Sequence, residues 1–306
     1  MANFITSQRP GWEDVVPIPQ DDGPSPVVMI DYPPAYIEAM DLFRAVLKTD
    51  ELSSRSLALS REVIELNPAN YTAWHFRRRC LYALGEDLDR ELDYIEQTAG
   101  PNPKNYQIWY HRRAIVEKIG NASREDSWVR SVLNEDSKNY HAWSHRQWYI
   151  KTFDMFDGEL EFITECLEDD PRNNSAWNQR WFAIHRGVPG ISGGQPGNEA
   201  AATVELEARY ALQYLAKDLR NPSPWHYLRG YFRNHAFADF SFVKEKCLEW
   251  MNDGSTSSYL LGFLVEIYRQ ENTPESLDEA RKLCGLLETE HDVTRSKYWA
   301  RVQKML

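Results

Sequence analysis

The sequence predicts an all-α protein: a crescent-shaped, right-handed superhelix, or solenoid, of antiparallel helical hairpins. Three observations predict this fold class. A short motif recurs about every 34 residues, apolar residues follow it at helical spacing, and the chain of 306 residues is 42% hydrophobic with 11 Trp, 16 Tyr and 12 Phe. One hairpin cannot bury its own apolar stripe, whereas stacked hairpins bury a continuous core.

The recurring motif is an Asn followed four positions later by a Trp. The tryptophans of the first four motif copies are 35, 34 and 34 residues apart, and that of the fifth copy follows after 48 residues. The five copies occupy residues 70–74, 105–109, 139–143, 173–177 and 221–225. The longer gap contains the Gly- and Pro-rich stretch Gly187–Gly197, which predicts a loop inserted between two hairpins.

Each motif copy is expected to begin a helix, because an Asn side chain accepts hydrogen bonds from first-turn amides and Pro often precedes such a start. An apolar residue lies seven positions after every Trp, on the same helical face: Leu81, Val116, Ile150, Ile184 and Phe232. Another amphipathic segment precedes each start, such as Asp89–Gln97 or Gly158–Leu167. One repeat is therefore a helix, a turn and a second helix, as in tetratricopeptide repeats.

The repeat cores are expected near residues 70–82, 105–117, 139–151, 173–185 and 221–233. An earlier helix pair is predicted at Tyr36–Thr49 and Leu52–Leu66. Helices at Ser257–Gln270, Ser276–Leu287 and Arg295–Leu306 are predicted to close the other end. We expect residues 31–306 to form a single helical-repeat domain and residues 1–30 to be extended or mobile.

Composition excludes several classes of protein. A net charge of −11 and an isoelectric point near 5.3 argue against binding to nucleic acid. The four cysteines are far apart and form no CxxC pair, so neither a zinc site nor a disulfide framework is predicted in this chain. No signal peptide or membrane-spanning segment is recognisable, and we expect a soluble, cytoplasmic protein without membrane insertion.

Arginine stands three positions after the Trp in four copies, as Arg77, Arg112, Arg146 and Arg180. A residue repeated at every copy usually serves the repeat itself, so these arginines are expected to tie one hairpin to the next. The first helix of a repeat is acidic and the second basic, which would make a surface lined by second helices locally basic and able to receive phosphate.

A ligand site needs particular residues at one place, so positions where the copies differ are more informative. Lys104, Tyr140 and His141 flank helix starts, where free amides and the helix dipole favour an anion, and they would form a cradle for a diphosphate. The alternative is that Tyr71, Tyr106 and Tyr140 pack between hairpins. No nucleophile and base pair, metalloprotease motif or glycine-rich phosphate loop is present, so the residues alone indicate a binding protein.

The chain resembles the α subunit shared by protein farnesyltransferase and protein geranylgeranyltransferase type I over nearly its whole length. The segments that carry the resemblance are Asp21–Val28, Asp41–Leu47, Asn70–Arg78, Pro103–Trp109, Lys138–Trp148, Asn173–Arg180 and Arg295–Trp299. The resemblance implies a heterodimer in which a β subunit holds a catalytic zinc, magnesium assists diphosphate departure, and a farnesyl or geranylgeranyl group moves from an isoprenoid diphosphate to the cysteine of a CaaX peptide.

The resemblance also implies roles for individual residues. Lys104, Tyr140 and His141 match residues that meet the diphosphate, with Asn139 beside them. Substrate-binding roles are implied for the peptide side of the site, where Gln107 matches a residue that binds the peptide's terminal carboxylate. Tyr71 matches a residue that lines the pocket for the last peptide residue, and Tyr106 matches one near the same cleft.

Two other functions remain open from the sequence. The chain could be a non-enzymatic helical-repeat scaffold that holds peptides on a concave surface. It could also be the α subunit of a Rab geranylgeranyltransferase, which would require a different β subunit. Copy-specific chemistry at Lys104, Gln107, Tyr140 and His141 favours the CaaX enzyme over the scaffold, since a scaffold has no need of such a set.

Overall fold

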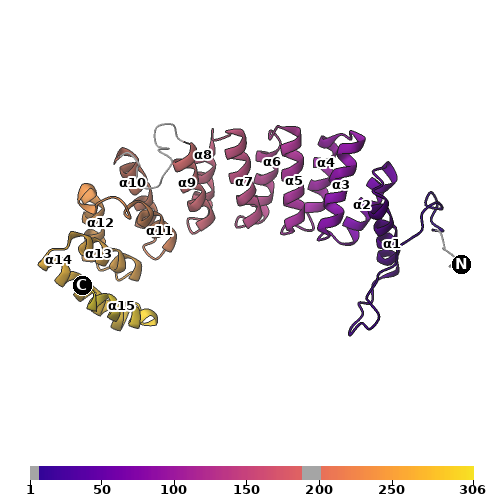
Figure 1. The fold of residues 1–306 in the computed structure, drawn as a ribbon. Coiled ribbons are helices and arrows are strands. Elements are labelled where there is room, and N and C mark those ends of the chain that lie inside the picture. Colours follow the sequence, from indigo (N-terminus) through magenta and orange to yellow (C-terminus); the bar gives the residue numbers. More distant parts are fainter. Residues whose placement is uncertain (1–6, 188–200) are drawn as a thin grey trace. The chain divides into compact units, whose positions relative to one another are not determined.

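The computed structural model describes residues 7–187 and 201–306. Within these ranges the chain is helical and contains no strand, which confirms the predicted all-helical repeat architecture (Figure 1). Its contacts divide it into two compact units, Met1–Tyr149 and Ile150–Leu306. The predicted insertion Gly187–Gly197 lies outside the described residues except for Gly187, which ends a helix.

The first unit is a series of helices that pack against their sequence neighbours. Its helices are α1 (Pro34–Thr49), α2 (Ser54–Leu66), α3 (Tyr71–Leu84), α4 (Leu88–Ala99), α5 (Tyr106–Ile119), α6 (Glu125–Glu135) and α7 (Tyr140–Phe153), the last of which contains the boundary between the units. Helix α3 also packs against α5, so the second helices of successive hairpins contact each other.

The second unit continues the same pattern. Its helices are α8 (Glu159–Asp169), α9 (Asn174–Gly187), α10 (Ala201–Lys217), α11 (Pro222–Tyr231), α12 (Ser241–Asn252), α13 (Ser258–Glu271), α14 (Pro274–Leu286) and α15 (Ser296–Lys304). Here α9 packs against α11, and α13 packs against both α12 and α14. A π-helical turn at Leu287–His291 follows α14.

The Asn–Trp motif builds every second helix in the same way. Each Asn side chain accepts a bond from a first-turn amide at 2.8–3.1 Å, as predicted for a helix cap. Each Trp indole N–H donates at 2.8–3.0 Å to the carbonyl six residues earlier, in the turn that precedes the helix. The five apolar residues seven positions after the tryptophans are all buried. The motif therefore fixes both the helix start and its packing.

The repeated arginines Arg77, Arg112 and Arg180 tie hairpins together, which confirms the structural role predicted for them. Arg77 of α3 forms two hydrogen bonds with Glu91 of α4, at 2.7 and 2.6 Å, and His111 of α5 contacts the same carboxylate at 2.7 Å. Arg180 binds Glu207 in the same bidentate way.

The expectation that arginines make the second helices a basic surface was wrong for the repeated position. Arg77 and Arg112 are 4% and 0% exposed, and both lie against carboxylates from the acidic helices. They therefore contribute no free charge to the surface.

Residues 7–33 contain no helix, and their first part lies against α1 and α2. Trp12 is buried with the Arg55 guanidinium 4.9 Å from its ring centre, and Arg44 donates to the carbonyl of Ile18. Farther along, Val27 and Val28 are 98% and 83% exposed. Among the described helices, none is both long and apolar enough to cross a bilayer.

Candidate functional site

The starts of α5 and α7 meet at one corner of the first unit, and Asn139 joins them. Its side-chain oxygen accepts from the amide of Ala142, which caps α7, and its Nδ2 donates to the carbonyl of Pro103 at 3.2 Å. The same carbonyl accepts the indole N–H of Trp109. With 1% of its surface exposed, Asn139 acts in this structure as a cap and a link between repeats.

Lys104 occupies the solvent side of this corner. Its Nζ lies 3.2 Å from Asp136 Oδ2, and its side chain is 74% exposed. The hydrogen bond from Lys104, with a second from the backbone of Lys138, holds the pKa of Asp136 below its usual value. An ammonium group this exposed, with one surface carboxylate as its partner, can change partners at small cost.

His141 lies directly beside Lys104. Partial burial lowers the pKa of His141, although a hydrogen bond with the backbone of Lys104 opposes that shift. The lowered pKa favours the uncharged imidazole. Its ring stands edge-on to Tyr106 with centroids 4.3 Å apart, and to Tyr140 with centroids 5.5 Å apart. The structure thus brings Lys104, Tyr106, Asn139, Tyr140 and His141 together.

The first-turn tyrosines are exposed and not buried between hairpins, although the Tyr106 ring contacts His141 of the next hairpin. Tyr71, Tyr106 and Tyr140 are 71%, 69% and 69% exposed, and their hydroxyls have no hydrogen-bond partner among the described residues. Buried Asn and Trp side chains hold the repeats instead. Exposed phenols at three successive helix starts are therefore available to a ligand or a partner.

Gln107 and Tyr71 lie outside the Lys104 cluster. Gln107 follows Tyr106 in the first turn of α5, is half-buried, and its side-chain amide makes no hydrogen bond within the described chain. Tyr71 opens α3, the neighbour of α5, and makes no ring contact with Tyr106 in the part of the chain that is described. Both side chains can bind a polar group of a ligand. Among the described residues, no hydrogen bond or ring contact joins either of them to Lys104 or His141.

The arrangement around Lys104 suits an anion. It offers an ammonium group, two phenol hydroxyls and the imidazole of His141 beside the first turn of α7, where backbone amides lack partners within the helix and the dipole is positive. The donors come from two helix starts, so they can bind separate oxygens of one extended anion. A diphosphate has that shape and charge.

The sequence reasoning missed the carboxylates that organise this corner. Asp136 pairs with Lys104, and buried Glu125 holds Arg112 and His145. A spacing signal existed, because Glu91 and Glu125 follow their arginine partners by 14 and 13 residues. Repeated acidic residues at that offset could have been paired with the repeated arginines.

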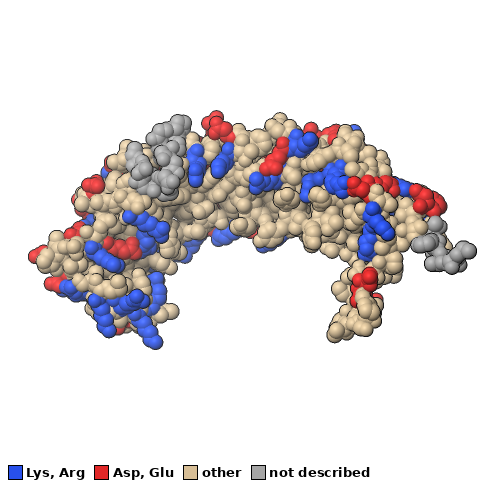
Figure 2. All heavy atoms as spheres, viewed as in Figure 1, with Lys and Arg blue, Asp and Glu red and all other residues tan. Residues whose placement is uncertain are grey.

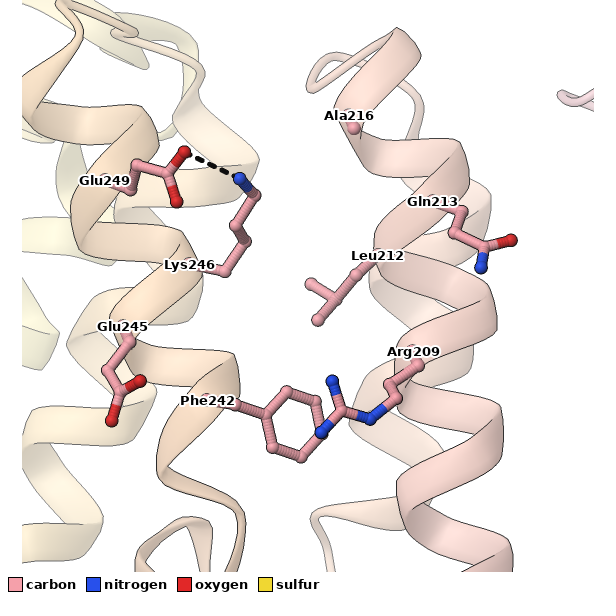
Figure 3. Close-up of a pocket in the computed structure, with 8 residues that line it drawn as sticks. All are labelled: Arg209, Leu212, Gln213, Ala216, Phe242, Glu245, Lys246 and Glu249. Carbon is pink, nitrogen blue, oxygen red and sulfur yellow. Dashed lines mark hydrogen bonds and ion pairs between the residues drawn. The ribbon is translucent and has the colours of Figure 1, made fainter.

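One concave surface of the second unit carries none of the predicted residues. A cavity of about 500 Å³ between α10 and α12 is lined by Arg209, Phe242, Lys246 and Glu249 among others (Figure 3). Arg209 lies over the Phe242 ring at 4.2 Å, and Lys246 pairs with Glu249 at 2.7 Å. Arg209, Lys246 and Glu249 are thus already engaged by neighbouring side chains.

Exposed basic charge gathers elsewhere in the second unit. Figure 2 shows Lys and Arg side chains over the C-terminal helix, where Lys297, Arg301 and Lys304 lie on the exposed side of α15. Among the described residues, no three His, Cys, Asp or Glu side chains are placed to hold a metal ion.

Comparisons with known proteins agree on one group. The model of the protein prenyltransferase alpha subunit repeat matches residues 53–84, 88–119, 122–153 and 156–187, which are the hairpins α2–α3 through α8–α9. The chain is 39% identical to the protein farnesyltransferase/geranylgeranyltransferase type-1 subunit alpha of Dictyostelium discoideum, over 96% of this chain and 91% of that protein. It is 42% identical to the subunit of the same name from Solanum lycopersicum, over 95% and 88%.

A solved structure gives the same result. This chain matches one in Candida albicans protein geranylgeranyltransferase-I complexed with GGPP, with a TM-score of 0.83 and 29% sequence identity. The match covers 97% of this chain and 99% of that one.

Proposed function

Because the chain belongs to the family of protein farnesyltransferase/geranylgeranyltransferase type-1 α subunits, we propose that it completes the active site of a CaaX protein prenyltransferase together with a β subunit. The enzyme transfers a farnesyl or geranylgeranyl group from an isoprenoid diphosphate to the cysteine near the C-terminus of its protein substrate. The chain alone is inactive in this proposal. The observation that carries it is the cluster of Lys104, Tyr140 and His141 at one corner.

In the proposed reaction the substrate thiolate attacks C1 of the isoprenoid, the bond from C1 to oxygen breaks, and diphosphate leaves with the electron pair. Negative charge grows on the diphosphate oxygens as that bond breaks. The ammonium of Lys104 lies where it can stabilise this charge, and the Tyr140 hydroxyl can donate a hydrogen bond to a further oxygen. His141 bonds the Lys104 backbone through one ring nitrogen, and it can donate to the diphosphate through the other when protonated. Groups that bind the developing charge more strongly than the substrate accelerate the step.

The peptide side of the site is assigned to the neighbouring helix starts. The free amide of Gln107 can donate to the terminal carboxylate of a CaaX peptide, and the exposed rings of Tyr71 and Tyr106 can line the pocket for its last residues. These groups stand on α3 and α5, adjacent to the Lys104 corner. A peptide and a diphosphate would therefore be held by consecutive hairpins.

Metal ions enter the proposal through the partner. A zinc ion would keep the peptide cysteine as a nucleophilic thiolate, and magnesium would assist the leaving diphosphate. The described residues of this chain offer no ligand set for zinc, so the proposal assigns that ion to the β subunit. No role of Lys104, Tyr140 or His141 in this proposal requires a metal ion bound to this chain.

The test is prenyl transfer to a CaaX peptide by the chain co-expressed with a β subunit. Lys104→Ala is expected to lower kcat/KM by about 100-fold, because a charge contact to the leaving group is removed. Arg172→Ala is the matched control. Arg172 precedes the Asn cap of α9 as Lys104 precedes that of α5, is 55% exposed, and pairs with Asp218 at 2.5 Å.

Two outcomes would contradict the proposal. No transfer by the native complex would remove the enzymatic role and leave the peptide-holding scaffold as the better explanation. Equal rates for native protein and Lys104→Ala, in a complex that assembles normally, would remove Lys104 from the diphosphate site.

A further inference from the structure

A buried carboxylate connects the two helices that carry the candidate site. Glu125 on α6 is 0% exposed. It accepts from Nε and Nη2 of Arg112 on α5 at 2.9 and 2.7 Å, and from His145 Nε2 on α7 at 2.5 Å. One side chain therefore binds both second helices whose first turns meet at the Lys104 corner.

The surroundings make this connection stiff. The Arg112 guanidinium is 0% exposed, lies 3.8 Å from the centre of the Trp128 ring, and makes another ion pair with Glu96. His145 also packs against Trp109 and Trp128. Glu125 and Arg112 each have more than one polar partner, and His145 packs against two Trp rings, so we expect a change in Glu125 to shift α5 and α7.

The two ends of the bridge lead directly to the site. Lys104 precedes α5 by two residues, and Tyr140 and His141 open α7. Arg112 lies six residues into α5 and His145 five residues into α7, or about 9 and 8 Å along a helix. Glu125 is also fully buried, so it does not touch an anion bound at the surface corner. We propose that Glu125 is a positioning residue, which sets the separation between Lys104 and the Tyr140–His141 pair and thereby the affinity for the diphosphate of the isoprenoid substrate.

This inference rests on the proposed function. It also distinguishes Glu125 from the equivalent buried glutamates of other hairpins. Glu91 joins α3 to α5, and Glu207 joins α9 to α11 through Arg180 and Tyr227. Each counterpart is as buried and as well bonded, but neither joins α5 to α7. Glu207 is thus a control with the same chemistry in the other unit.

The experiment measures steady-state kinetics of the complex of this chain with its β subunit, with geranylgeranyl or farnesyl diphosphate and a CaaX peptide. Glu125→Gln keeps the size of the side chain and one acceptor oxygen but removes the charge. It is expected to raise KM for the isoprenoid diphosphate about tenfold, because a small displacement of a binding group has a large effect, while KM for the peptide changes less than about twofold. Glu207→Gln is expected to leave both KM values within about twofold.

A second variant guards against a folding failure. His145→Gln keeps a donor to Glu125, as Gln179 donates to Glu159 at 2.7 Å in the next hairpin, and it is expected to retain diphosphate affinity. Binding of inorganic pyrophosphate to the assembled complexes supplies an activity-independent measurement.

The inference is overturned if Glu125→Gln and Glu207→Gln change diphosphate binding equally, or if Glu125→Gln weakens peptide and diphosphate alike. A native complex that binds no isoprenoid diphosphate contradicts the proposed function instead.

Discussion

The corner between α5 and α7 has a counterpart between α9 and α11. The two are held by the same set of contacts, which form a shared frame. In each, an Asn caps the later helix and donates to a proline carbonyl just before the earlier helix. The pairs are Asn139 with Pro103 at 3.2 Å and Asn221 with Pro171 at 2.8 Å. In each, a cation before the earlier helix meets an aspartate three residues before the later Asn. The pairs are Lys104 with Asp136 and Arg172 with Asp218.

The two corners differ in the side chains mounted on that frame. Tyr106, Tyr140 and His141 are replaced by Asn174, Pro222 and Ser223. Ser223 donates to the carbonyl of Arg172 at 3.5 Å, so even the polar contact beside the cation persists. The difference teaches that an ion pair at a helix start belongs to the repeat, whereas exposed phenols and an imidazole beside it mark the candidate site.

The largest expected effect is on the shared frame. Trp109→Phe and Trp177→Phe each remove an indole N–H that donates to a proline carbonyl, at 2.9 and 3.0 Å, and leave a cavity. Each is expected to destabilise the chain by about 3 kcal/mol. Urea unfolding followed by circular dichroism measures this. A loss of stability for one Trp variant but not for the other would show that the two corners are not held in the same way.

The Asn caps test the same frame at a smaller scale. Asn139→Ala and Asn221→Ala each remove a helix cap and a buried hydrogen bond, so each is expected to cost about 2 kcal/mol. Only Asn139→Ala is expected also to weaken diphosphate binding, since only its corner carries the proposed site. Similar affinity losses for both variants would argue against a site restricted to α5 and α7.

A third test compares the side chains that donate to a buried glutamate in two hairpins, His111 to Glu91 and Gln179 to Glu159. Burial lowers the pKa of His111 to about 4, against the opposing effect of its bond to Glu91. The unfolded chain then binds a proton more readily than the folded chain, so stability is fully present above pH 6.5 and is lost as pH falls from there towards 4. The Gln179 hairpin has an uncharged donor in the same place.

His111→Gln is therefore expected to flatten the decline of unfolding free energy below pH 6.5, by about 1 kcal/mol per pH unit. Urea titrations at pH 7, 6 and 5 give the slopes. The amide of Gln179 shows that the geometry accepts this side chain, so stability at pH 7 is expected to remain close to native. Parallel slopes for native protein and variant would show that His111 does not control the acid sensitivity.

The smallest expected effect concerns the two surface cations. Lys104→Ala and Arg172→Ala each remove an exposed ion pair and are expected to change stability by less than about 1 kcal/mol. Thermal unfolding of the complexes measures this. A large loss for Lys104→Ala alone would mean that its effect on transfer reports folding rather than diphosphate binding.

Much of the fold was predictable because the motif combines two local signals. Asn caps and Trp spacing place helix starts within one residue, as at Tyr71, Tyr106 and Tyr140. The division of contacts into two units was not predicted, since no change in composition marks Tyr149. The expectations of a single domain and of roles for the seven site residues remain predictions.

The site was predictable only in part. Copy-specific residues such as Gln107 and His141 were recognised because they depart from the repeat. The acidic partners of Lys104 and Arg112 were not recognised, because pairing depends on which helix faces which, and Asp136 and Glu125 lie on segments that carry many carboxylates. A sequence gives the spacing of such residues but not the choice among neighbouring acids.

The bridge from Arg180 to Glu207 spans 27 residues, whereas the equivalent bridges span 14 and 13. The contact is nevertheless bidentate, as at Glu91. Chain length between α9 and α10 is thus uncoupled from the bond that joins their repeats.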